Sequence, residues 1–175
     1  MCIRDRANVD YEKVRSAIRF EYPRANDLPS AGFAAGPCLF KDTMQLAAFT
    51  GNDFPLGNAA MLVNEGQPNF VVDKLKAKYQ LEKLNVGILG MAFKGESDDC
   101  RSSLAYKLKR ILKFNAKNVL CTDPFVNDSN LSPIEKVLEE SDLLIIGAPH
   151  KIYSTLEYKI PVVDIWNLLG RGSML

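Results

Sequence analysis

Three side chains that could do covalent chemistry lie close together in the stretch GPCLFKD, residues 36–42. Pro37 suits the first position of a helix, so Cys38 would lie in the first turn, where the positive end of the helix dipole favours a thiolate. Lys41 and Asp42 follow on the same predicted helix face. Such a face offers a nucleophile, a cation for developing oxyanion charge and a carboxylate for moving protons or holding water. The alternative is a small buried cysteine with solvated neighbours.

A second candidate site is the glycine-containing stretch VGILGMAFKGESDD, residues 86–99. An apolar strand enters this stretch, and in parallel α/β sheets phosphates bind to backbone N–H groups at such a point. The glycine spacing does not match GxGxxG, so the glycines could equally serve only a tight turn between a strand and a helix. Lys94 and Arg101 would add positive charge for a pyrophosphate, unless they are merely solvated.

The cysteine stretch lies in a half of the chain that is predicted to be helical. Apolar spacing indicates a helix over residues 9–20, and the Pro, Gly, Ala and Ser of residues 23–36 indicate an irregular loop. A helix over residues 37–49 follows. The pattern over residues 56–79 predicts a long central helix, which a glycine and a proline within it would kink or break.

From about residue 84 the pattern changes to alternating strands and helices. The predicted helices cover residues 101–113 and 132–140, and the predicted strands are the apolar runs NVGILG, NVLCTDP, DLLIIGAP and PVVDIW. One-piece apolar strands that alternate with helices are typical of a parallel sheet buried on both faces. We therefore expect an α/β fold, in which an all-helical segment with a long central helix (residues 7–81) precedes a Rossmann-like parallel-sheet domain (residues 82–175).

The composition is that of a globular chain: 175 residues, of which 47% are hydrophobic and 25% charged. A net charge of +1 with scattered basic residues predicts no nucleic-acid partner. The chain has no apolar run of the roughly 18 residues that a membrane span needs and no signal-peptide pattern, so we expect no membrane partner and a cytoplasmic location.

Four cysteines without paired spacing and one histidine predict neither disulfides nor a metal site. Residues 1–6, MCIRDR, look like translated linker, and we expect them to be a non-native leader.

Taken together, the motifs resemble the UDP-glucose/GDP-mannose dehydrogenase family of nucleotide-sugar 6-dehydrogenases. The stretches that carry the resemblance follow one another in order over residues 7–175: GFAAGPCLFKD, a long helix, VGILGMAFKGESDDCRSS, TDPFV and VVDIWN. They resemble the later part of such an enzyme, namely the cysteine helix, the central helix and the UDP-sugar-binding domain. The resemblance implies NAD-dependent oxidation of a sugar C6 alcohol to a carboxylate. It also implies that this chain is a fragment, inactive alone, without the amino-terminal NAD-binding domain.

The resemblance implies a role for each candidate residue. Cys38 would be the nucleophile that holds the sugar as a thiohemiacetal and then as a thioester, with Asp42 as acid/base and water-positioning partner and Lys41 as a catalytic neighbour. Arg101 would bind the cofactor by reaching toward the NAD pyrophosphate. No metal is expected. The residues implied to bind the substrate are Gly32, Phe33, Gly36, Phe93 and Lys94.

Several points are left open by the sequence. The loop before the cysteine is one residue longer than the commoner forms in the family, and the sugar could be UDP-glucose, UDP-N-acetylmannosamine, UDP-N-acetylglucosamine or GDP-mannose. A homodimer through the central helix is implied by the resemblance. The alternative to an enzyme is a non-catalytic module that binds a nucleotide sugar or assembles with a full-length subunit; an unrelated thiol oxidoreductase is disfavoured because the chain has no CxxC pair. No role is assigned to His150, Trp166, Asn167 or Arg171.

Overall fold

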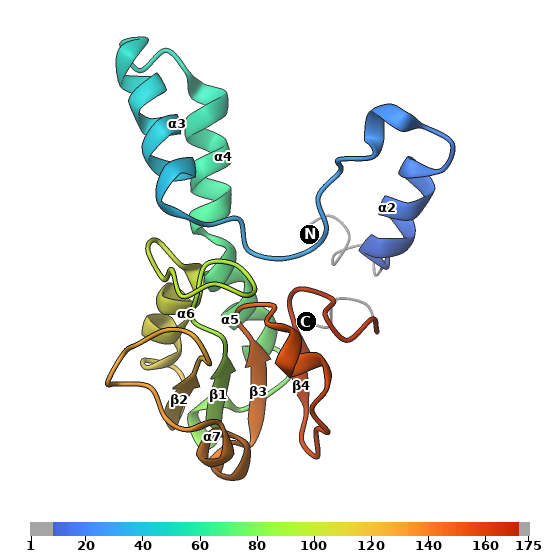
Figure 1. Ribbon diagram of the computed structural model, residues 1–175. Coiled ribbons are helices and arrows are strands. Elements are labelled where there is room, and N and C mark those ends of the chain that lie inside the picture. Colours follow the sequence, from blue (N-terminus) through green and yellow to red (C-terminus); the bar gives the residue numbers. More distant parts are fainter. Residues whose placement is uncertain (1–8, 172–175) are drawn as a thin grey trace.

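The computed structural model describes residues 9–171 and shows a helical amino-terminal part joined to a parallel sheet with helices on its two faces (Figure 1). The α/β fold class predicted from the sequence is confirmed. The expectation that residues 1–6 are a non-native leader concerns residues outside the described range.

The helical part follows the predicted order closely. Asp10 caps its first helix, because its carboxylate accepts a hydrogen bond from the Glu12 N–H at 3.0 Å. A proline stands in the first turn of each of the three helices that follow the loop. The elements are α2 (Tyr11–Arg19), the short 3-10 helix η1 (Pro23–Ala25), α3 (Pro37–Phe49), α4 (Pro55–Glu65) and α5 (Gln67–Lys76).

The predicted central helix is present and is divided into α4 and α5 at Gly66. Gly66 keeps right-handed helical angles, with φ −78° and ψ −11°, and its carbonyl accepts from the Phe70 N–H at 3.1 Å. Pro68 has no N–H to donate to the preceding turn, so the regular hydrogen bonding is interrupted at this point. In Figure 1, α3 and α4 form a hairpin that projects away from the sheet, whereas α5 lies against it.

The second part is a four-stranded parallel sheet in the order β2-β1-β3-β4. In the register, Ile88 of β1 lies between Cys121 of β2 and Ile145 of β3. Each strand after β1 follows a crossover, as parallel pairing requires. The elements are η2 (Leu81–Lys83), β1 (Asn85–Leu89), α6 (Leu104–Leu112), β2 (Asn118–Thr122), α7 (Ile134–Glu140), β3 (Leu143–Ile146), η3 (Lys151–Ser154) and β4 (Val162–Asp164).

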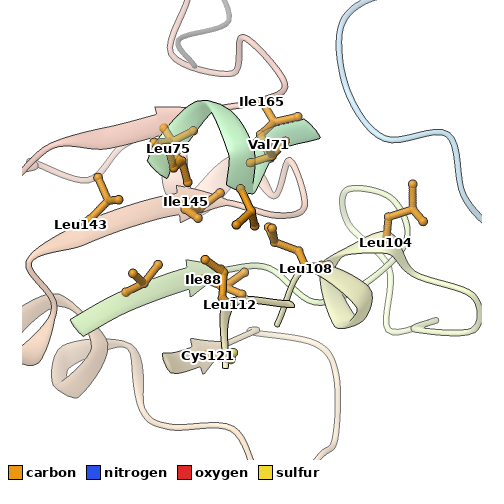
Figure 2. Close-up of a cluster of buried hydrophobic side chains, with 14 of the residues drawn as sticks. Val71, Leu75, Ile88, Leu104, Leu108, Leu112, Cys121, Leu143, Ile145 and Ile165 are labelled. Atoms are coloured by element: carbon orange, nitrogen blue, oxygen red, sulfur yellow. The ribbon is translucent and has the colours of Figure 1, made fainter. Parts of the chain in front are cut away.

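Both faces of the sheet are buried, which explains why its strands are apolar without alternation. Val86 and Ile88 face one side, where α5 and α6 pack, and Figure 2 shows this cluster with Val71 and Leu75 from α5 and Leu108 from α6. Leu89 and its neighbours face the opposite side, where Val137 of α7 and Tyr153 of η3 cover them. The division at residues 81 and 82 stays a prediction; the buried side chains of α5 belong to the same core as the strands.

None of the helices within residues 9–171 is long and apolar enough to cross a membrane.

Candidate functional site

The carboxyl ends of the strands meet at one edge of the sheet, which is the edge that binds ligands in folds of this kind. Gly90 turns the chain after β1 with φ +92°, and a Cβ there would lie 2.7 Å from the backbone nitrogen of Ala148, so only glycine fits. Asp123 follows β2, and Gly147 follows β3. From Gly90 onward the predicted glycine stretch therefore lies at this edge, whereas Gly87 lies inside β1, paired with Leu120 and Leu144.

The carboxylate of Asp123 organises the turn after β1. Its Oδ2 accepts hydrogen bonds from the Met91 N–H at 2.6 Å and the Ala92 N–H at 3.0 Å. Burial would raise the pKa of Asp123, but the His150 hydrogen bond and several backbone N–H groups hold this pKa well below its ordinary value. Because two amides at the turn already donate to a carboxylate, the turn geometry favours a structural role for its glycines over pyrophosphate binding.

His150 joins the same network from the end of β3. Its Nδ1 accepts from the Glu96 N–H at 2.9 Å, and its Nε2 lies 3.0 Å from Asp123 Oδ2. A backbone N–H can only donate, so Nδ1 is the acceptor and the Nε2–H donates to Asp123. Both side chains are fully buried. Neither residue had a role predicted from the sequence; the available signal was a histidine directly after the predicted strand DLLIIGAP and an aspartate near the end of the predicted strand NVLCTDP.

The loop after β1 carries three of the predicted site residues. The Phe93 N–H donates to the Asp99 carbonyl at 2.9 Å and closes the loop, and Lys94 Nζ lies 5.4 Å from the centre of the Phe93 ring. The side-chain hydrogen bond from Arg101, 2.7 Å from Nη2 to Oδ2, lowers the pKa of Asp99 to about 2. The Arg101 side chain remains 71% exposed, so it can still meet an anion.

The loop that precedes the cysteine rests on this edge of the sheet. A Cβ at Gly32, where φ is +140°, would overlap the Trp166 ring, and a Cβ at Gly36 would lie 3.2 Å from Phe93 Cε2. Phe33 is buried and meets Trp166 edge to face, with ring centroids 6.3 Å apart. Only the backbone of Phe33 is therefore placed to contact a substrate. Trp166, whose role the sequence left open, fixes this loop from the end of β4.

The three residues singled out on α3 are arranged as two groups. Cys38 is exposed at the start of the helix. The Asp99 hydrogen bond raises the pKa of Arg101 and charge on Cys38 adds to the effect, so the thiol and the guanidinium lie within electrostatic reach of each other. Lys41 Nζ lies 3.2 Å from Asp42 Oδ1 in an exposed ion pair, and Asp42 also lines an apolar groove of about 420 Å³ between α3 and α4.

The structure therefore brings part of the predicted site together. Gly36, Phe93, Cys38 and Arg101 lie around the start of α3, and the Lys41–Asp42 pair lies further along the same helix. Within residues 9–171, no cluster of three or more histidine, cysteine or acidic residues could hold a metal ion.

Comparisons with known proteins agree on one family. Residues 87–171 match the model of the UDP binding domain of the UDP-glucose/GDP-mannose dehydrogenase family. The chain is 33% identical over 129 residues to the UDP-N-acetyl-D-mannosamine dehydrogenase of Pyrococcus horikoshii, a match that covers 71% of this chain and 31% of that protein.

Two solved structures have the same architecture. The UDP-D-ManNAc dehydrogenase of Pyrococcus horikoshii superposes with a TM-score of 0.81 at 26% identity, covering 95% of this chain and 43% of that one. The UDP-glucose dehydrogenase of Pyrobaculum islandicum gives a TM-score of 0.78 at 27% identity, covering 92% and 41%. The chain thus spans less than half the length of each of these proteins.

The burial of the cysteines predicts how they react with a thiol reagent. We expect iodoacetamide at neutral pH to alkylate the exposed Cys38 readily and to leave Cys121 unmodified, because Cys121 is buried in β2 and its burial raises its pKa to about 11. Peptide mass spectrometry over time would measure both rates. In concentrated urea the two rates should converge, and equal rates in the folded protein would contradict the described packing.

Proposed function

The chain belongs to the UDP-glucose/GDP-mannose dehydrogenase family, and we propose that it forms the cysteine-bearing and substrate-binding part of an NAD-dependent UDP-sugar 6-dehydrogenase. The reaction would oxidise the C6 alcohol of the sugar to a carboxylate. Because the chain covers 31% of its curated relative, the activity is proposed for the complete enzyme. The observation that carries the proposal is the contact of Gly36 with Phe93, which joins the start of the cysteine helix to the loop after β1.

This contact suits a ligand that extends from the carboxyl edge of the sheet to the start of the cysteine helix. A UDP group on the carboxyl edge of the sheet would meet the Phe93 ring and the Lys94 ammonium, which can neutralise diphosphate charge. The backbone between Gly32 and Gly36 would then border the sugar. The sugar would lie next to the start of α3, where Cys38 is exposed. The relatives named above act on UDP-N-acetyl-D-mannosamine and UDP-glucose, and we propose one of these two sugars.

Cys38 makes the second oxidation feasible. A free aldehyde is a poor hydride donor, whereas addition of the thiolate gives a thiohemiacetal whose C6 still carries a hydrogen. After oxidation to the thioester, water adds to C6, the thiolate leaves and a carboxylate remains. Asp42 would take the proton of this water, and Lys41 would hold the Asp42 carboxylate through their ion pair.

NAD, when bound, supplies the hydride acceptor for both oxidations. Arg101 would bind this cofactor, because its guanidinium is exposed and interacts electrostatically with Cys38. Its hydrogen bonds to Asp99, from Nε and Nη2, fix the plane of the guanidinium before an anion binds.

The α3–α4 hairpin is suited to pairing with a second copy of the chain. Large apolar side chains are exposed along it, and a cluster of exposed apolar side chains is typical of a surface that binds a partner. We propose a homodimer through this hairpin, in keeping with the central-helix dimer that the sequence resemblance implies. The exposed apolar side chains are Phe40, Met44, Leu46, Phe49, Leu56, Leu62 and Val63.

The first prediction for the proposed function concerns binding of the nucleotide. We expect Lys94→Ala to weaken the affinity of the chain for UDP about tenfold, because a charge-assisted contact to the diphosphate is lost. Isothermal titration calorimetry measures this affinity. The matched control is Lys136→Ala, an exposed lysine on the distant α7, which should bind UDP like the wild type. Affinity unchanged by Lys94→Ala would remove Lys94 from the site.

The second prediction concerns the covalent step. In the complete enzyme, Cys38→Ala should abolish formation of the sugar acid, because no thiohemiacetal can form. Mass-spectrometric assay of the product measures this loss. Cys121→Ala is the control: its thiol is buried within the sheet, and the variant should keep its turnover. Ordinary turnover by Cys38→Ala would refute the covalent role and leave a non-catalytic module as the better interpretation.

The third prediction concerns assembly. Leu62 is 75% exposed on α4, and Leu62→Lys should convert the dimer to monomers because a charge would be buried at the interface. Size-exclusion chromatography with light scattering measures the mass. Phe114→Lys changes a side chain that is 91% exposed beyond α6 and should leave the dimer intact. A wild-type monomer at all concentrations would disprove the proposed assembly.

A further inference from the structure

The buried pair of Asp123 and His150 holds the loop over residues 91–96 at both of its ends. Asp123 Oδ2 accepts from the Met91 and Ala92 N–H groups, 2.6 and 3.0 Å away, at the start of the loop. His150 Nδ1 accepts from the Glu96 N–H at 2.9 Å at its end. The two side chains are joined to each other by the 3.0 Å contact between His150 Nε2 and Asp123 Oδ2. One continuous hydrogen-bond chain therefore spans the loop.

Further contacts surround the loop and add to this chain of hydrogen bonds. Ser103, which caps α6, donates from Oγ to the Ala92 carbonyl at 3.2 Å. A Cβ at Gly95 would lie 2.5 Å from the Pro149 carbonyl oxygen, so the loop runs directly over the backbone next to His150. Glu96 has φ +53°, a conformation that is unfavourable for a side-chain-bearing residue unless neighbouring contacts hold it. Its N–H bond to His150 and its Oε1, which accepts from the Lys151 N–H at 2.8 Å, supply that support.

Between the two anchored ends, the loop presents the two side chains that would meet the nucleotide. Phe93 and Lys94 lie at its middle, and the Phe93 ring packs against Gly36 at the start of the cysteine helix. A displacement of the loop would therefore alter the nucleotide contacts and the support of the cysteine helix together.

We propose that Asp123 and His150 are positioning residues, which fix the loop over residues 91–96 so that Phe93 and Lys94 are preorganised for the nucleotide. The inference rests on the proposed function, since it names the loop as part of the UDP-sugar site. Neither residue touches the ligand; each acts through the backbone N–H groups that it holds. A preorganised loop does not have to be ordered when the ligand binds, so loosening it adds an entropic cost and lowers the affinity.

The pairing of donors and acceptors shows which substitution breaks this chain of hydrogen bonds. In Asp123→Asn the side chain keeps its size, but one of its two polar atoms becomes an NH₂ donor. If this NH₂ replaces Oδ2, it faces the Met91 and Ala92 N–H groups; if it replaces Oδ1, it faces those of Phe125 and Val126. Either orientation leaves two backbone donors facing a donor, and buried donors without acceptors are costly.

The test compares UDP affinity with stability in matched variants of the chain. We expect Asp123→Asn to weaken UDP binding at least about tenfold by calorimetry and to speed amide hydrogen exchange at residues 91, 92 and 96. Asp128→Asn is the control: Asp128 likewise accepts from a backbone N–H, that of Asn130, and from the Tyr106 hydroxyl, but it does not reach the loop. It should lower the thermal midpoint without changing UDP affinity by more than about twofold.

His150→Gln is the second variant, because the amide carbon takes the place of Nδ1, so the acceptor for the Glu96 N–H is displaced by one bond, while an NH₂ donor for Asp123 is kept. It should weaken UDP binding and speed exchange at Glu96 more than at Met91. The inference is overturned if folded Asp123→Asn and His150→Gln bind UDP like the wild type, if Asp128→Asn loses as much affinity as they do, or if neither variant folds. Failure of the wild type itself to bind UDP would overturn the proposed function, and with it the inference.

Discussion

The buried carboxylate of Asp123 is the interaction on which the geometry of the carboxyl edge of the sheet depends. It gathers N–H donors from the turn after β1, from its own turn after β2 and, through His150, from the end of β3. A carboxylate that accepts this many hydrogen bonds stays ionised despite its burial. Segments far apart in the sequence are thereby fixed around one charge, and the loop after β1 acquires a single conformation.

A second contact region, between the loop before α3 and the sheet edge, fixes the helical part relative to the sheet. The loop before α3 fits closely against Trp166 and Phe93, and two glycines with positive φ allow the approach. Trp166 is itself held by a hydrogen bond from its Nε1 to the Gly147 carbonyl at 3.2 Å. Next to the division at Gly66, Glu65 of α4 pairs with Lys107 of α6. The cysteine helix is thus connected to the sheet part at its N-cap residue, Gly36, and through the end of its partner helix α4.

The sheet and the α3–α4 hairpin contribute different features to the molecule. The sheet, buried on both faces, supplies a rigid edge at which polar groups converge. The hairpin of α3 and α4 supplies an exposed thiol and an exposed apolar surface. Since α5 packs against the sheet with its buried side chains and continues from α4 through Gly66, it joins the hairpin to the sheet. A site that needs groups from both parts is therefore set by the packing at this junction.

The sequence alone determined the elements and their order, because apolar periodicity, prolines at helix starts and one-piece strands are local signals. It also singled out Cys38, Phe93, Lys94 and Arg101, whose motifs resemble those of one family. Only the tertiary structure showed that the His150 Nε2–H donates to Asp123 and that Phe33 is buried against Trp166. It also showed that the Met91 and Ala92 N–H groups donate to the Asp123 carboxylate. Those facts depend on contacts between residues far apart in sequence, and no local pattern encodes which donors will meet which acceptors when the strands align.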